Sequence, residues 1–209
     1  REEGENRSQA YIIDLSAKDI HVLIPRSQTR FRFVSPLVDS RNKVLVAMNE
    51  RDSTAFDIYR LDVGSGEREM IARNPGNIIR WYADLDGQLR LALASDSVVE
   101  TMLYRASEQE EFRPVTRNSF RTTVNPLGFA KGKKNHVYAL SNADRDKMSL
   151  VEINAETGQE TNVLFSHAES DVSPGGYSEQ TGSISYAYYF TWKRERHYLN
   201  DQVRAMYEK

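Results

Sequence analysis

A serine nucleophile is the first chemistry to look for in this chain, because the sequence contains no cysteine. Hydrolases that use serine place it in a Gly-x-Ser-x-Gly turn, where only small residues fit beside the nucleophile. The nearest stretch is Gly176-Tyr177-Ser178-Glu179-Gln180, which lacks the second glycine. No aspartate lies between Ser178 and His197, the one histidine that follows it. We therefore expect Ser178 to lie in a polar loop that enters a strand near Ile184, and we predict no catalytic residue in this chain.

Histidines could serve as metal ligands or general bases, but their spacing does not favour either role. No two of them form a His-x-x-x-His pair, and none lies in a compact acidic cluster. We expect strand-end or surface positions for them, and we predict neither a metal nor a cofactor-binding site. The four are His21, His136, His167 and His197.

Two arginine-aspartate pairs could also take part in a functional site: Arg51-Asp52 and Arg145-Asp146. Each follows an asparagine, and the two asparagines, Asn49 and Asn142, are 93 residues apart. A feature that recurs at equivalent places usually belongs to a scaffold. We expect the polar turn residues to cap backbone N–H groups and the arginines to fasten one sheet to the next.

The charge balance excludes several classes of protein. Lys and Arg number 28 and Asp and Glu 30, giving a net charge of −2, so a generally basic nucleic-acid binder is excluded. No apolar run approaches the roughly 18 to 20 residues of a membrane helix. We predict a soluble chain with no nucleic acid or membrane partner. The sequence does not distinguish a cytoplasmic from a periplasmic location. The basic runs Lys131–Lys134 and Lys193–Arg196 are expected to be solvated hairpin tips.

The elements that position these residues are strands. Short runs rich in β-branched and aromatic residues alternate with glycine turns, as antiparallel hairpins do. Only Asp201–Lys209 has helical character, with Asp201 as its expected N-cap. The densest aromatic group spans Tyr186–Trp192, so both faces of that strand are expected to be covered in a complete fold. Exposed sheet edges would allow self-association.

The strands recur with a period of about 47 residues. Tyr11 corresponds to Tyr59, then to Tyr104 and Val151, with shifts of 48, 45 and 47. A strand lies 13 residues before each later copy. About four strands per 40 to 50 residues is typical of a propeller blade, whereas a β-sandwich, the main rival, lacks in-register copies.

The period predicts an all-β, incomplete β-propeller of about four to five four-stranded antiparallel blades with a short C-terminal helix. Dividing 209 residues by the period gives roughly 4.4 blades, which is not a whole number. We expect one partial propeller domain over residues 1–209. Its blades are predicted at about 1–35, 36–80, 81–125, 126–173 and an incomplete 174–209.

Several of these stretches together resemble a known family. The chain is similar to the N-terminal propeller of bacterial prolyl oligopeptidase-family serine peptidases, the dipeptidyl aminopeptidase or acylaminoacyl-peptidase-like group. The resemblance extends from about Asn6 to about Tyr207. The stretches that carry it are Val44–Asp52, Asp57–Asp62, Asn74-Pro75-Gly76, Tyr138–Asn142, Arg145-Asp146-Lys147 and Leu150-Val151-Glu152.

The resemblance implies a non-catalytic role for this chain. In that family the propeller precedes an α/β-hydrolase domain, docks on it and filters peptide substrates by size. We expect that domain, the partner of this one, to lie outside the chain. Two alternatives remain open: a stand-alone TolB-like module that binds a protein or peptide, and an enzyme such as a glycosidase with carboxylates inside the propeller. Candidates for the latter are Asp14, Asp62 and Asp84, although the first two are repeat equivalents.

Overall fold

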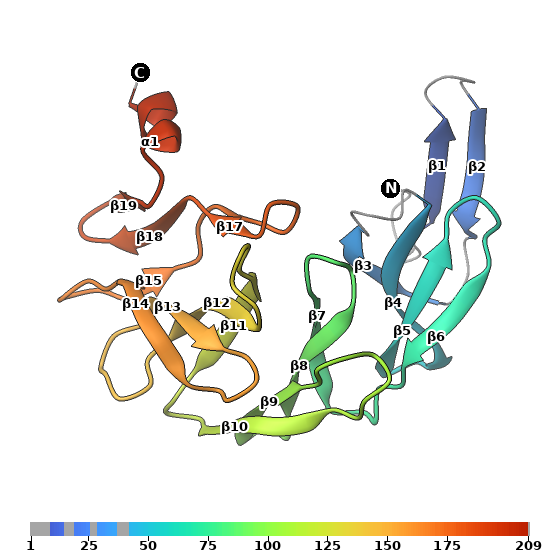
Figure 1. The fold of residues 1–209 in the computed structure, drawn as a ribbon, viewed down its shortest axis with the longest axis horizontal. Helices are drawn as coiled ribbons and strands as arrows, with labels where there is room; N and C mark the ends of the chain where they lie inside the picture. Colours follow the sequence, from blue (N-terminus) through green and yellow to red (C-terminus); the bar gives the residue numbers. More distant parts are fainter. Residues whose placement is uncertain (1–8, 15–18, 26–28, 37–41, 209) are drawn as a thin grey trace. The chain divides into compact units, whose positions relative to one another are not determined.

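The computed structural model describes residues 9–14, 19–25, 29–36 and 42–208. They form antiparallel sheets joined mainly by short turns, with one short helix (Figure 1). The all-β class and the C-terminal helix are therefore confirmed. The chain divides into two compact units, residues 1–78 and 79–209, and each is described by itself.

The first unit contains a hairpin and a four-stranded sheet. Strands β1 (Ala10–Asp14) and β2 (Asp19–Ile24) form the hairpin. The sheet has the order β3-β4-β5-β6, with bounds Phe31–Pro36, Lys43–Asp52, Ala55–Asp62 and Arg68–Ala72. Ala10 and Ile24 of the hairpin pack against Val46, Met48 and Tyr59 of the sheet. Burial of both faces of β4 and β5 makes the middle of this sheet the core of the unit.

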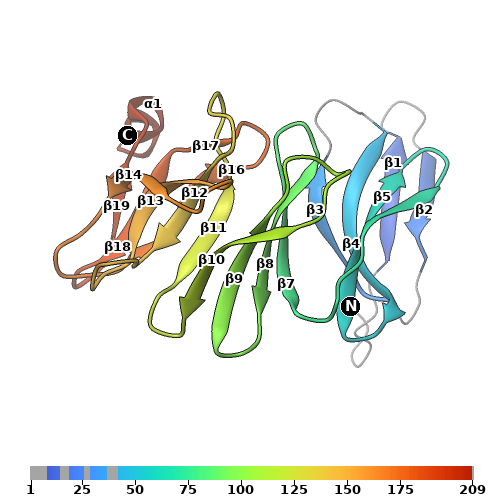
Figure 2. The same ribbon diagram turned by 60° about the horizontal axis from the view of Figure 1, so that its bottom comes forward.

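The second unit begins with two four-stranded sheets, which lie next to each other in Figure 2. One apolar cluster joins them: Leu91, Met102 and Tyr104 of the first sheet pack with Val137 and Val151 of the second. The first has the order β7-β8-β9-β10, with bounds Ile78–Ala83, Leu89–Ser95, Val99–Tyr104 and Arg113–Ser119. The second has the order β11-β12-β13-β14, with bounds Val124–Phe129, His136–Ser141, Ser149–Asn154 and Glu160–Phe165.

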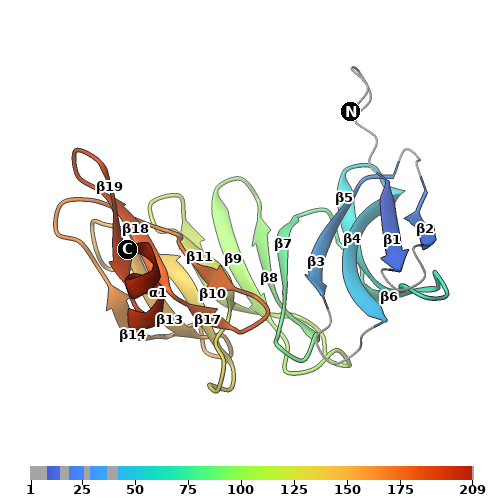
Figure 3. The same cartoon turned by 90° about the horizontal axis from the view of Figure 1, so that it is seen from above.

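A three-stranded sheet, a small hairpin and a helix complete this unit. The sheet has the order β15-β18-β19, with bounds Val172–Ser173, Tyr186–Phe190 and Arg194–Tyr198. The hairpin pairs β16 (Tyr177–Ser178) with β17 (Ser183–Ile184). Leu140 and Leu150 of the preceding sheet pack against Val172, Ile184 and Ala187. Helix α1 (Asp201–Tyr207) follows β19 and contacts it (Figure 3).

The helix begins one residue earlier than the sequence indicated. Asn200, not Asp201, is the N-cap, and its Oδ1 accepts hydrogen bonds from the backbone N–H groups of Gln202 and Val203. Asp201 instead occupies the first turn, where a carboxylate favours the helix dipole. Asn and Asp are both favoured N-cap residues, so the sequence alone did not distinguish Asn200 from Asp201.

The strand spacing is reproduced in part. Val46 pairs with Tyr59, and Leu91 pairs with Tyr104, each 13 residues away. In the next sheet Tyr138 pairs with Glu152 rather than Val151, so this hairpin departs from the spacing by one residue. The predicted blade boundaries near 35, 80 and 125 fall inside the first strand of each sheet, because the clearest sequence copies lay in the later strands.

Candidate functional site

Ser178 lies in the short strand β16, which continues into a turn and then β17. Its Oγ accepts a hydrogen bond from the Thr181 N–H at 3.3 Å. A nucleophile elbow requires a strand followed directly by a helix, and here a hairpin takes that place. Ser178 is therefore a turn-stabilising residue in this structure.

The histidines occupy separate environments. His21 pairs with Asp19 at 3.1 Å on an exposed hairpin, and His136 Nδ1 lies 2.8 Å from the Lys134 carbonyl oxygen. His197 stacks on Phe165 with ring centroids 3.9 Å apart, and burial lowers its pKa. His167 stacks on Tyr189 at 4.6 Å. Within the described ranges, no three His, Cys, Asp or Glu side chains form a group that could hold a metal ion.

The nominated carboxylates cap turns. Asp62 Oδ1 accepts hydrogen bonds from the N–H groups of Gly64 and Ser65, which lower its pKa, the Ser65 bond having the larger effect. Asp84 accepts bonds from the N–H groups of Asp86 and Gln88, and burial raises its pKa. The side chain of Asp14 lies outside the described residues. Asp62 and Asp84 therefore hold the backbone of separate turns.

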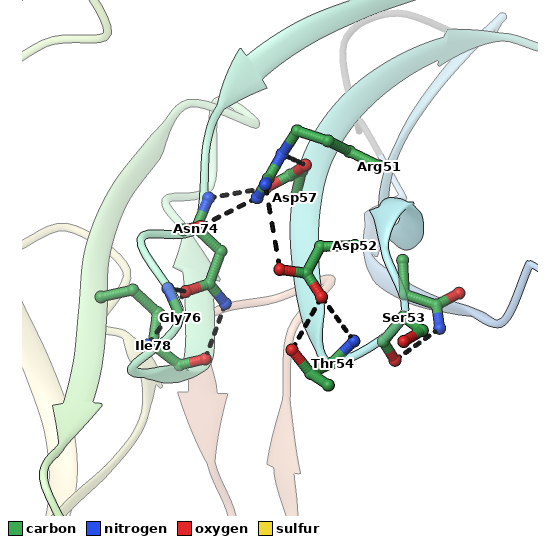
Figure 4. A network of polar contacts seen from close by, with 9 residues as sticks. Arg51, Asp52, Ser53, Thr54, Asp57, Asn74, Gly76 and Ile78 are labelled. Carbon is green, nitrogen blue, oxygen red and sulfur yellow. Dashed lines mark hydrogen bonds and ion pairs between the residues drawn. The ribbon is translucent and has the colours of Figure 1, made fainter.

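Arg51 is at the centre of a polar network in the first unit (Figure 4). Its guanidinium donates to both carboxylate oxygens of Asp57, at 2.8 and 2.9 Å, and to the Asn74 carbonyl oxygen at 3.0 Å. Asp57 is completely buried and also accepts a bond from the Asn74 N–H at 2.7 Å. Asn74 in turn bonds to Gly76 and Ile78. Arg51 thus fixes the connection that leaves β6, and its charge is neutralised.

The two asparagines of the recurring turn make matching contacts. Asn49 Oδ1 accepts the Arg30 N–H, and Asn142 Oδ1 accepts the Thr123 N–H. Arg30 and Thr123 each precede the first strand of a sheet. Each asparagine therefore joins the segment entering its sheet to the end of the second strand. This supports a scaffold role for both residues.

The arginines of the two turns are less alike. Arg145 pairs with Glu160 of the same sheet, and Arg51 contacts the residues leaving its own sheet. Neither of these contacts reaches a neighbouring sheet, so the described residues do not show the expected fastening role for these two arginines. Other residues provide it in the second unit. Arg90 of β8 donates to Asn135 Oδ1 at 2.6 Å, and Arg80 of β7 donates to Asn125 Oδ1 at 3.0 Å.

One basic run is not a simple solvated tip. Lys133 Nζ lies 2.7 Å from Glu152 Oε2, and the Glu152 side chain is only 2% exposed. This bond raises the pKa of Lys133. The other Glu152 oxygen, Oε1, is buried without a hydrogen-bond partner. The lysine turn therefore neutralises a buried carboxylate, which the local sequence does not indicate because the two residues are 19 positions apart.

The second basic run joins the aromatic group to form the candidate binding site. Across β18 and β19, Tyr186 pairs with Tyr198 and Tyr188 pairs with Arg196. Arg196 lies over the Tyr207 ring of α1 at 4.2 Å, and Arg194 over the Tyr188 ring at 4.6 Å. A pocket of about 370 Å³ opens here. Its lining comprises Tyr188, Arg194, Glu195, Arg196, Tyr198 and Glu208.

Arg196 sets the electrostatics of this pocket. A hydrogen bond with Arg196 lowers the pKa of Tyr188, and the Tyr188 bond raises the pKa of Tyr186 to about 12. Arg196 has a raised pKa through its bonds to Tyr188 and Tyr198. The group can bind a polar ligand. The interpretation of Lys193–Arg196 as a solvated tip missed this group, although the alternation of Arg194, Arg196 and Tyr198 at every second position could have indicated it, because such residues share one strand face.

The chain has a propeller-type fold. It has 14% sequence identity to TolB from Acinetobacter baumannii, with a TM-score of 0.56, covering 87% of this chain and 42% of that one. A solved prolyl endopeptidase has 11% identity and a TM-score of 0.53, covering 87% of this chain and 27% of that one. These likenesses show the fold alone.

A curated protein that is similar in sequence is a peptidase. Dipeptidyl aminopeptidase BIII of Pseudoxanthomonas mexicana is 26% identical over 209 residues, which is 99% of this chain and 30% of that protein. No family model matches the chain. The resemblance to the propeller of this peptidase group, predicted from the sequence, is confirmed. The chain spans less than a third of the length of this relative.

Proposed function

We propose that this chain is a non-catalytic propeller segment of a serine peptidase. The observation that carries the proposal is the similarity of nearly the whole chain to 30% of a dipeptidyl aminopeptidase. On this proposal the sheets are blades, the α/β-hydrolase domain lies outside the 209 residues, and the propeller docks on it and limits the size of peptides that enter.

The first hairpin supports a role as one part of a larger assembly of sheets. Tyr11 pairs with Val22 and Ile13 with Ile20, so all four side chains share one face of the hairpin. Each of them is more than half exposed within the described structure. Such an apolar face is stabilised by covering it with a further sheet, as stacked repeat units do.

The contacts between the two four-stranded sheets of the second unit support the gating role. Arg90 bonds to Asn135 of the next sheet, and an ion pair with Asp84 at 3.3 Å holds its guanidinium. Asn135 then donates to Glu156 Oε2 at 2.9 Å. Polar clamps of this kind keep neighbouring blades together, so that only small peptides pass.

The proposal is tested on the complete polypeptide that the gene encodes, next to the 209-residue chain. We expect the complete polypeptide to contain a Gly-x-Ser-x-Gly elbow and to hydrolyse dipeptidyl arylamides, and the 209-residue chain to show no turnover. A reading frame that ends at Lys209, or turnover by the short chain that is lost in Ser178→Ala, would refute it.

Gating is tested separately with Arg90→Ala in the complete polypeptide. Loss of the clamp should raise kcat/KM for a 20-residue peptide relative to that for a dipeptidyl arylamide. The matched control is Arg68→Ala, which removes an exposed arginine whose ion pair with Glu50 lies within the first unit. An unchanged ratio in a folded Arg90→Ala protein would contradict the gating role.

A further inference from the structure

The pocket lined by β18, β19 and Glu208 contains two guanidinium groups that its own carboxylates do not neutralise. Glu195 pairs with Lys193 at 3.4 Å, and Glu208 pairs with Arg204 at 3.0 Å, so both glutamates already have cationic partners. Over the part of the chain that the structure describes, no ion pair joins Arg194 or Arg196 to a carboxylate. The two guanidinium groups are therefore the uncompensated charges of the pocket.

The second observation is an unused donor. Arg196 Nε is buried and has no hydrogen-bond acceptor among the residues that the structure describes. A buried donor without a partner costs free energy, so an acceptor that can reach this donor would gain a favourable bond. The hydroxyl groups of the pocket tyrosines can donate further hydrogen bonds to the same acceptor.

The aromatic rings hold the guanidinium groups in place. Arg196 lies over Tyr207 at 4.2 Å and over Tyr186 and Tyr188 at 5.6 Å. A guanidinium stacked on a ring keeps its N–H groups in its own plane, and the N–H groups that Tyr188 and Tyr198 do not use can donate to a planar acceptor. Little conformational entropy is then lost when such an acceptor binds. A carboxylate matches this geometry because its two oxygens can accept a bidentate pair of bonds.

We propose that this pocket binds a side-chain carboxylate of an acidic peptide, with Arg194 and Arg196 as donors and the tyrosine rings as contacts for the peptide backbone. The lowered pKa of Tyr188 makes its hydroxyl a strong donor as well. The inference stands on the second unit alone and does not depend on the peptidase proposal.

The test uses the full 209-residue chain and a fluorescein-labelled hexapeptide of alternating Glu and Gly, followed by fluorescence anisotropy. We expect saturable binding, and at least about tenfold weaker binding when Gln replaces Glu, since each charge-assisted bond contributes about 1.5 to 3 kcal/mol. Equal binding of the two peptides, or no binding, would overturn the proposal. Inorganic phosphate that displaces the peptide at lower concentration than acetate would also overturn it, in favour of a phosphate site.

Variants locate the binding. Arg196→Gln and Arg194→Gln should each weaken binding about tenfold or more. Tyr188→Phe keeps the ring and removes the hydroxyl, so it should weaken binding by a smaller factor without loss of fold. Arg68→Ala, in the other unit, should bind as the unchanged chain does. Folding of each variant is checked by its circular dichroism spectrum. Tight binding by folded Arg196→Gln and Arg194→Gln would place the peptide elsewhere and refute the assignment.

Discussion

Replacing Arg51 by alanine gives a direct test of how the first unit is held together. The carboxylate of Asp57 is fully buried and accepts three hydrogen bonds, two from Arg51 and one from the Asn74 N–H. In Arg51→Ala two of the three disappear, and the carboxylate is left without its counter-ion. Breaking a buried pair in this way usually costs about 3 to 5 kcal/mol.

The expected cost lies at the lower end of that range. The Arg51 side chain is 31% exposed, so water can partly replace it at the carboxylate. We expect a loss of about 3 kcal/mol in the free energy of local opening, which corresponds to roughly 100-fold faster exchange of backbone amides. Arg145 is the matched control, because it follows the equivalent asparagine. Its partner Glu160 is 21% exposed, so Arg145→Ala should cost about 1 kcal/mol.

Hydrogen exchange with mass spectrometry measures this in each unit separately. Peptides that cover β4 and β5 should exchange about 100-fold faster in Arg51→Ala, while peptides from residues 79–208 keep their rates. In an Asp57→Asn background, Arg51→Ala should cost much less, because the buried charge is already absent. Equal effects of Arg51→Ala and Arg145→Ala, or no coupling with Asp57→Asn, would show that burial of Asp57 does not set the stability of this network.

Three further predictions concern the other described contacts. Asn142→Ala should destabilise the junction at Thr123 by about 1 to 2 kcal/mol, whereas Asn142→Asp, which keeps only the hydrogen-bond acceptor, should destabilise it by less. Amide exchange over β11 measures both effects, and equal effects of the two variants would contradict the acceptor role. Asn200→Ala should fray α1 at a cost of about 1 kcal/mol, more than Asp201→Ala, as read from the exchange of the Gln202 and Val203 amides; the reverse order would restore Asp201 as the cap. Burial lowers the pKa of His197, so the folded state favours its neutral form. The stability of the folded chain that depends on neutral His197 is therefore complete above about pH 6.5, the usual histidine pKa, and is lost as the pH falls from there toward the lowered pKa. His197→Phe should remove that part of the pH dependence of the thermal midpoint, while His21→Gln should not; equal slopes in His197→Phe and the unchanged chain would refute it.

The sequence predicted what recurs. Apolar residues at fixed spacing placed the third strand of each full sheet, because Tyr59, Tyr104 and Val151 are buried at similar positions in their sheets. The asparagine turns were predicted as scaffold for the same reason. The one-residue slip at Tyr138 could not be foreseen, since the length of a hairpin turn is set by local backbone geometry rather than by the apolar pattern.

Long-range polar pairs could not be predicted either. Lys133 and Glu152, or Arg90 and Asn135, are far apart in sequence and meet only because two strands or two sheets align. Charge runs are ordinarily solvated, so composition alone favoured a solvated tip for both basic runs. The alternation of arginine and tyrosine in β19 was the one sequence pattern that pointed to the pocket. It becomes informative only when the strand pairing places the tyrosines of β18 opposite β19.

This contrast helps to separate scaffold from site in the second unit. Asn142 has a counterpart with matching hydrogen bonds in another sheet, and Asn49 is that counterpart. Arg196, with Tyr186, Tyr188 and Tyr207 around it, has no such match, because the positions two residues before Tyr59, Tyr104 and Val151 hold Asp57, Met102 and Ser149. The charged equivalent, Asp57, is paired with Arg51, whereas no ion pair among the described residues joins Arg196 to a carboxylate. Arg196 is therefore the residue on which the proposed site depends, and the carboxylate assay decides whether an acidic peptide binds there.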